Sequence, residues 1–174
     1  MSYTIEDLTS IDDAIFDTLW DASFPRIESG ATMLWRKYDA KPLTSDEKKG
    51  IIKNIFTMAL ESGPDSKLYL CRKDGTPIRM FNASVFDSVA VCHYTLYGPD
   101  ADGSRSWLYD GEVLRQTRDQ LTSDFDVTGH TIHVATGSPM HTYYLSRGNE
   151  REHSVSETQG NDGISIITFT YTGE

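Results

Sequence analysis

The sequence lacks the features that mark several large classes of protein. Its 174 residues include two cysteines, Cys71 and Cys92, which are too few for a disulfide framework and fit no zinc-ligand spacing. No apolar run reaches the ~20 residues that a membrane-spanning helix needs. The N-terminal residues also lack the basic and apolar regions of a signal peptide. We therefore expect a cytoplasmic protein with two buried thiols and no membrane partner.

Positive charge is scarce as well. The chain has 16 lysines and arginines against 26 aspartates and glutamates, which gives a formal net charge of −10 and a sequence pI of about 4.8. A field of this sign repels phosphate backbones, and no basic run reverses it locally. We expect no nucleic-acid partner, and the simplest role of the acidity is to keep the protein soluble.

Common catalytic and metal-binding motifs are missing. The chain has no Walker loop, no Gly-x-Ser-x-Gly elbow and no His-Glu-x-x-His pair. Its five histidines are scattered, and His130 and His133 face opposite sides of the strand that we expect there. Cys92 and His93 are adjacent in another expected strand, so their side chains also point apart. We expect neither a metal site nor a cysteine nucleophile.

The sequence does contain the periodicities of a mixed helix and strand fold. Apolar residues make up 38% and charged residues 24% of the chain, which is typical of a globular protein, and we interpret 1–174 as one domain. A short strand is expected at 3–8, followed by a helix at 9–24 with Thr9 as its N-cap. Residues 25–43, which contain prolines and a glycine, show no clear period.

The remaining elements follow from equally local signals. A second helix begins where Thr44 and Glu47 have capping-box spacing, and it ends before Gly63 and Pro64. After it we expect two strands within 67–81 around an Asp74-Gly75 turn, a strand at 88–99, a helix at 107–125, a strand and a helix within 130–149, and two strands within 152–172. The order is therefore β-α-α-β-β-β-α-β-α-β-β, a mixed α/β chain.

The segment 138–148 has the signals of a short helix. Ser138 is an expected N-cap, and Pro139 suits the first turn, where a missing N–H costs nothing. Gly148 can adopt the left-handed conformation that ends a helix. Tyr143 and Tyr144 lie in its last turn, and the sequence leaves open whether they fill a core or serve in chemistry.

The order of elements and the spacing of Tyr143, Tyr144 and Gly148 resemble the GNAT acyltransferase superfamily. The order matches over nearly all of the chain, although Asn149 stands where the family usually has an aromatic residue. The resemblance implies a mostly antiparallel central sheet flanked by helices, and acetyl-CoA as co-substrate. It also implies that Tyr144 protonates the thiolate of coenzyme A as this leaves, which suits a phenol of pKa near ~10.

The family also has a glycine-rich turn between its fourth strand and its third helix, where main-chain N–H groups bind the pyrophosphate of coenzyme A. The matching region of this chain contains Gly103, Ser104, Arg105, Ser106 and Trp107. The arginine and the tryptophan stand where the family has small residues, and Asp100 and Asp102 add negative charge nearby. The arginine could meet the phosphates as a side-chain donor. The resemblance thus assigns pyrophosphate binding to residues 103–107.

Two functional hypotheses follow. The first is an N-acetyltransferase that moves an acetyl group from coenzyme A to a small-molecule or peptide amine. In it Tyr144 is the general acid and His93, on the expected fourth strand, is a candidate base. Family members often pair, so a homodimer is possible. The second is a catalytically inactive binding or assembly module that keeps the fold but has lost coenzyme A binding. Its motives are the altered glycine turn and three aromatic residues that we expect to be exposed, Trp35, Trp107 and Tyr109.

Overall fold

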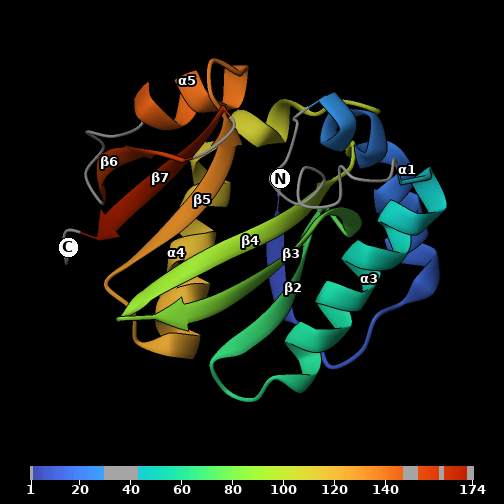
Figure 1. The fold of residues 1–174 in the computed structure, drawn as a ribbon, viewed down its shortest axis with the longest axis horizontal. Helices are drawn as coiled ribbons and strands as arrows, with labels where there is room; N and C mark the ends of the chain where they lie inside the picture. The colour runs from blue at the N-terminus through green and yellow to red at the C-terminus, as the bar shows by residue number, and fades with distance from the viewer. Residues whose placement is uncertain (1, 30–42, 147–152, 161–162, 172–174) are drawn as a thin grey trace.

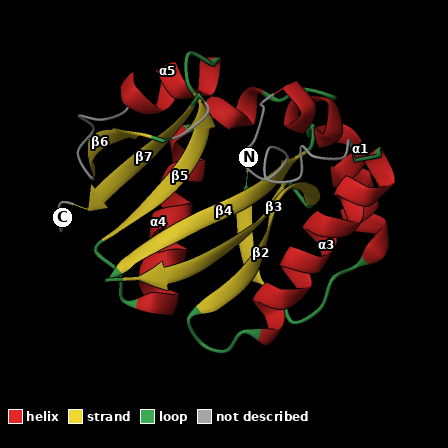
Figure 2. Ribbon diagram, in the orientation of Figure 1, coloured by secondary structure: helices red, strands yellow, loops and turns green. Residues whose placement is uncertain are grey.

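Seven strands form one sheet with helices on both faces (Figures 1 and 2). The structure is a computed structural model, and it describes residues 2–29, 43–146, 153–160 and 163–171. The strand order is β1-β2-β3-β4-β5-β7-β6. Every neighbouring pair is antiparallel except β4 and β5, which are parallel. The expected mixed α/β class with a mostly antiparallel sheet is confirmed.

The elements also follow the expected order. They are β1 (Tyr3–Asp7), α1 (Asp13–Ser29), α3 (Ser45–Glu61), β2 (Ser66–Lys73), β3 (Thr76–Phe86), β4 (Val89–Tyr97), the 3-10 helix η1 (Ser106–Tyr109), α4 (Gly111–Phe125), β5 (Gly129–Ala135), α5 (Pro139–Ser146), β6 (His153–Gln159) and β7 (Ile164–Tyr171). None of the described helices combines the length and the apolar character that crossing a bilayer requires.

Several local signals act as the sequence predicts. The Thr44 hydroxyl accepts a hydrogen bond from the main-chain N–H of Glu47 at 3.1 Å, and α3 begins at the next residue. Asp74 and Gly75 have φ angles of 48° and 85° and join β2 to β3. Two successive positive φ angles match the twist of a hairpin, which is why this dipeptide is favoured there.

Three boundaries differ from the prediction. Helix α1 begins at Asp13 rather than near Thr9, because the carboxylate of Asp12 caps it by accepting the N–H of Ile15 at 3.1 Å. The same helix continues past Pro25, which removes one N–H donor without ending it. The expected helix at 107–125 is divided, since the Asp110 carboxylate accepts the Glu112 N–H and starts α4 after η1.

The sheet separates two hydrophobic cores. Helices α1 and α3 cover one face, where Phe16, Phe56 and Leu68 are fully buried. Helix α4 lies behind the sheet in Figure 1, and the core on that face includes Phe81 and Leu121. Both cysteines are buried free thiols, as the sequence predicts.

Candidate functional site

Strands β4 and β5 separate soon after they meet. Their parallel pairing covers Val89–Val91 on β4 and Gly129–Thr131 on β5. Beyond it β4 continues to Tyr97 and β5 to Ala135, and Figure 1 shows the two strands diverging toward the end of the sheet where α5 lies. Within the described residues, the main-chain groups on the facing edges of this splay therefore have no neighbouring strand.

A β-bulge changes the direction of β4 within the splay. The register with β3 pairs Phe81 with Thr95 but Ala83 with Cys92, so β4 has one extra residue opposite Asn82. The Asn82 side chain accepts the main-chain N–H of Tyr94 at 3.0 Å, which supplies the partner that the ladder does not. Bulges bend a strand and re-aim its side chains, and this one lies where β4 leaves β5.

The end of β4 is held from both sides. Gly98 donates its N–H to the Ile78 carbonyl of β3 at 2.7 Å. On the other edge of β4, Tyr97 donates its N–H to the Ser23 hydroxyl, and the same hydroxyl donates to the Tyr97 carbonyl. Because main-chain groups alternate between the two edges of a strand, those of Thr95 point the same way as those of Tyr97, toward β5.

Helix α5 carries the two tyrosines of the motif. Ser138 caps it by accepting the N–H of His141 at 3.2 Å, as predicted. The ring of Tyr144 meets Phe169 of β7 edge to face at 5.7 Å between centres. The ring of Tyr143 meets Tyr109 of η1 in the same way at 5.2 Å. The two tyrosines therefore have different neighbours, β7 for one and η1 for the other.

Tyr144 lies in a group of side chains that includes Tyr97 and Arg79, and the sequence did not predict that these residues would be neighbours. Burial raises its pKa well above the ordinary value for tyrosine, and nearby Tyr97 raises it further, while the positive charge of Arg79 lowers it. Arg79 lies opposite Tyr97 in the β3–β4 register. An arginine in the apolar strand that contains Ile78 and Met80 was the one sequence signal for this residue.

His93 lies on the other face of the sheet. Its Nε2 is 2.6 Å from the Ser84 hydroxyl, and its ring stacks with that of Tyr94, which packs against the α1 and α3 core. Desolvation, followed by the nearby His133, lowers the pKa of His93. The imidazole is therefore neutral near pH 7 and can accept a proton. It does not share a face with Tyr144.

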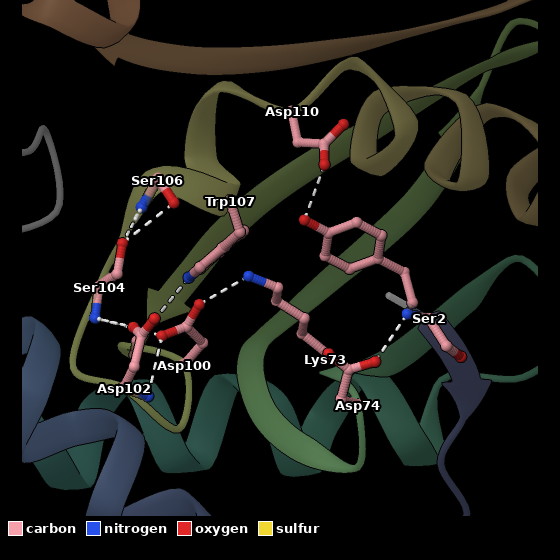
Figure 3. Close-up of polar contacts among 11 residues, drawn as sticks. Ser2, Lys73, Asp74, Asp100, Asp102, Ser104, Ser106, Trp107 and Asp110 are labelled. Carbon is pink, nitrogen blue, oxygen red and sulfur yellow. Dashed lines mark hydrogen bonds and ion pairs between the residues drawn. The ribbon is translucent and has the colours of Figure 1, made fainter.

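The loop between β4 and η1 is built around the carboxylate of Asp100 (Figure 3). One oxygen of this carboxylate accepts the main-chain N–H groups of Asp102 at 3.2 Å and Ser104 at 3.1 Å. The other accepts the Lys73 ammonium of β2 at 2.7 Å. Hydrogen bonds from Asp102 and then Lys73 lower the pKa of Asp100 to about 2, so it is ionised at neutral pH. Two amides and an ammonium group are thus directed at one anion.

Other parts of the same loop also have internal partners. The Ser106 N–H donates to the Ser104 hydroxyl at 3.1 Å, and the Gly103 N–H donates to the Asp100 carbonyl at 3.0 Å. Arg105 donates through Nη2 to the Ala22 carbonyl of α1 at 3.0 Å. The guanidinium that was a candidate phosphate donor therefore ties the loop to α1.

Trp107 corrects one expectation. Only 2% of its surface is exposed, because its ring packs on Tyr97 and its Nε1–H donates to the Gly98 carbonyl at 2.9 Å. Tyr109, in contrast, is 44% exposed, as expected. Trp35 lies outside the described residues. The indole is part of the core beneath η1 and not of an exposed aromatic surface.

The two loop amides and the Lys73 ammonium are suited to bind an anion, but the Asp100 carboxylate already accepts hydrogen bonds from all three. A diphosphate could take the two amides and the ammonium only if the Asp100 carboxylate moved away, and the Ser104 N–H would also have to leave the Asp102 carboxylate, to which it donates at 2.8 Å. The N-terminus of α4 is likewise capped by Asp110, which also accepts the Tyr3 hydroxyl at 2.8 Å. The predicted pyrophosphate contact at 103–107 stays a prediction, with the condition that the loop must exchange its own carboxylate for the ligand.

A cavity of about 400 Å³ lies elsewhere, where β1 meets α1. Its lining includes Glu6, Asp7 and Asp12. Glu6 is paired with Arg72 and Asp7 with Lys67. The apolar part of the lining, which includes Met80, belongs to the α1 and α3 face. This cavity is therefore separate from the group around Tyr144.

The fold is that of the GNAT acetyltransferases. The PaiA N-acetyltransferase of Thermoplasma acidophilum, solved with coenzyme A, is similar over 98% of this chain and 100% of its own, with 14% identity and a TM-score of 0.58. The aminoglycoside acetyltransferase AAC(6')-Ib, solved with ribostamycin and coenzyme A, is similar over 99% of this chain and 94% of its own, with 12% identity and a TM-score of 0.63. An acetyltransferase of Streptococcus agalactiae covers 97% and 98%, with 12% identity and a TM-score of 0.59.

Sequence comparison adds nothing to this. No protein-family model matches the chain, and no curated protein matches its sequence. At 12–14% identity the solved structures establish the shared architecture, whereas the chemistry depends on the residues of the site.

Proposed function

We propose that this chain transfers an acyl group, acetyl in the simplest case, from a coenzyme A thioester to an amine. The observation that carries the proposal is the position of Tyr144, a neutral phenol on α5 at the splay of β4 and β5. The similar structures of PaiA and AAC(6')-Ib contain coenzyme A. The unpaired edge of β4, with the main-chain groups of Thr95 directed toward β5, suits an amide-containing arm that lies alongside a strand.

The reaction needs two proton transfers: one proton must be given to the leaving sulfur, and one must be removed from the attacking nitrogen. The amine nitrogen attacks the thioester carbonyl carbon, the new C–N bond forms, and the C–S bond breaks with its electron pair going to sulfur. Tyr144 supplies a proton to the sulfur as it leaves, because its hydroxyl stays protonated at neutral pH. The nitrogen gives up its extra proton on the other face, where His93 is the candidate acceptor, directly or through water.

The acceptor is proposed to be a small-molecule or peptide amine. The two proposed proton-transfer residues lie on opposite faces of the sheet, so donor and acceptor would approach the splay from opposite sides. A net charge of −10 attracts cations and so favours an amine that is protonated in solution over an anionic acceptor. One proton must then leave such an amine before it attacks.

Binding of the donor is the first test. We expect acetyl-CoA at 100 times its dissociation constant to stabilise the fold by about 2.7 kcal/mol, which raises the melting temperature by roughly 5–10 °C for a chain of this length. Differential scanning calorimetry measures the shift, and titration calorimetry measures the heat of binding. If millimolar acetyl-CoA gives no heat of binding and no shift in melting temperature, the proposal is contradicted.

The carboxylate of Asp100 gives a second prediction. Asp100→Asn keeps an oxygen for the two loop amides but removes the negative charge that occupies the Lys73 ammonium. Because that charge competes with a diphosphate for the same donors, we expect coenzyme A to bind roughly tenfold more tightly, which corresponds to ~1.4 kcal/mol. Titration calorimetry with coenzyme A measures this change.

The matched control for this prediction is Asp74→Asn. Asp74 is an exposed aspartate whose carboxylate accepts the Ser2 N–H, so the variant makes the same change in net charge outside the loop. Pantetheine, which has no phosphate, should bind wild type and Asp100→Asn equally. Equal coenzyme A affinity of Asp100→Asn and wild type would show that the phosphates do not enter this loop.

A second candidate function is a GNAT-fold module without donor binding. The observation that favours it is the Asp100 carboxylate, since it holds donors that a diphosphate would need. The calorimetric experiments separate the two candidates, because such a module shows no acetyl-CoA binding in either the wild type or Asp100→Asn.

A further inference from the structure

Among the described residues, Arg79 is a half-buried cation without a partner of opposite charge. It lies on β3, where its Nη1 donates to the Thr117 hydroxyl of α4 at 3.2 Å and its Cζ lies 3.9 Å from the centre of the Phe81 ring. Its Nε is buried and has no hydrogen-bond acceptor among the described residues. No carboxylate in the described part of the chain pairs with it, although the chain carries 26 acidic residues.

This arrangement does not serve stability. An arginine keeps its charge even when buried, and removing a charge from water is costly unless a counter-charge and hydrogen bonds replace the solvent. The ring of Phe81 and the hydroxyl of Thr117 replace only part of it. The titratable groups that face the guanidinium are Cys71, Tyr97, Tyr144 and Cys92. Both thiols and Tyr144 are neutral near pH 7, since burial raises the pKa of each of them.

The position of Arg79 relates it to the proposed chemistry. It is opposite Tyr97, at the end of β4 where the splay is widest. Its positive charge lowers the pKa of Tyr144, whereas burial raises it. In the proposed reaction, negative charge appears first on the sulfur, as the C–S bond breaks, and then on the Tyr144 oxygen, once the phenol has given its proton to the sulfur. A fixed positive charge nearby lowers the energy of both species.

We propose that Arg79 is the counter-charge of the reaction: its guanidinium stabilises the negative charge that passes from the leaving sulfur to the oxygen of Tyr144. It is a positioning residue, because it acts through its field and through Tyr144 rather than by contact with the donor. The inference rests on the proposed acyl transfer. It explains why the described residues give this cation no anionic partner, since the negative charge exists only during turnover.

The test is the dependence of the rate on the leaving group. We expect Arg79→Met to lower kcat with acetyl-CoA by at least ~10-fold, because an alkyl thiol of pKa about 8.5 leaves with much negative charge to stabilise. With an acetyl aryl thioester, whose thiol is a far stronger acid, the loss should shrink to a few-fold. Arg79→Lys keeps a positive charge and should retain much of the activity. Arg72→Met, on the neighbouring strand β2, is the control, because Arg72 has a carboxylate partner in Glu6.

A second readout does not depend on turnover. The thiol of bound coenzyme A, titrated by its thiolate absorbance, should ionise at lower pH in wild type and Arg79→Lys than in Arg79→Met. An equal loss of rate with both donors, or an unchanged thiol titration, would overturn the proposal and leave Arg79 with a packing role. If Arg79→Met does not fold, Arg79→Gln, which also removes the charge but keeps a polar side chain, takes its place in the same two measurements. If coenzyme A does not bind wild type at all, the proposed function fails first, and the two failures are thereby distinguished.

Discussion

Replacing Tyr144 by phenylalanine is expected to lower kcat for acyl transfer by about 100-fold or more, the range in which general acid catalysis contributes. The hydroxyl is the group that would protonate the leaving sulfur, and the ring that carries it packs on Phe169. The ring remains, so its packing and the binding of acetyl-CoA should be nearly unchanged. Steady-state kcat and KM, measured with acetyl-CoA and an amine acceptor, separate the two effects.

The adjacent tyrosine is the matched control. Tyr143 differs from Tyr144 in that its ring packs on Tyr109 of η1, so Tyr143→Phe should change kcat by no more than a few-fold. Melting temperatures of both variants should stay close to that of wild type. A Tyr144→Phe enzyme that is as active as Tyr143→Phe would remove the phenol from the mechanism, even if acetyl-CoA still bound.

Replacing Trp107 by alanine is expected to lower the free energy of unfolding by about 3–5 kcal/mol. The indole is 2% exposed, packs on Tyr97, and donates its N–H to the Gly98 carbonyl. Its loss leaves a cavity under η1 and an unsatisfied carbonyl at the end of β4. Domains are stable by only about 5–15 kcal/mol, so this single change should move the urea midpoint strongly.

Two further variants test the reason for that loss. Trp107→Phe keeps an aromatic ring but not the N–H, and it should cost about 1–3 kcal/mol, mainly for the unpaired carbonyl. Tyr109→Ala removes an aromatic residue of the same 3-10 helix that is 44% exposed, and it should cost less than Trp107→Ala. If Trp107→Ala and Tyr109→Ala were equally stable, the indole would not be a core residue.

The parts of the fold that the sequence predicted depend on neighbours in the chain. The capping box at Thr44, the Asp74-Gly75 turn and the Ser138 cap each involve residues within a few positions of one another, so their geometry follows from local sterics and hydrogen bonding. Where two local candidates competed, the prediction was wrong: Asp12, three residues beyond Thr9, caps α1. Element order was predictable for the same reason.

The candidate site was predictable to a much smaller extent, because it depends on contacts between distant residues. The sequence identified Tyr144 and the region 103–107 through a family resemblance, and their roles stay predictions. It did not show that Lys73, 27 positions before Asp100, holds that carboxylate in the loop. Nor did it show that Arg79 would have no counter-charge among the described residues and that its Nε would be buried without an acceptor there. Trp107 was expected at the surface, because no nearby residue in the chain indicated that its N–H would donate to the Gly98 carbonyl.

The brief parallel pairing of β4 and β5 has a mechanical consequence. In the described sheet, the leaf formed by β1–β4 and the leaf formed by β5–β7 are joined by main-chain hydrogen bonds along three residues of each strand and by the adjoining Thr128 N–H, which donates to the Ser88 carbonyl at 2.9 Å. Few hydrogen bonds therefore resist a small change in the angle between the leaves, whereas each leaf is stiffened by long antiparallel ladders. A molecule bound in the opening would contact both leaves at once and restrain the angle between them. Binding at the site would therefore also make the whole sheet more rigid.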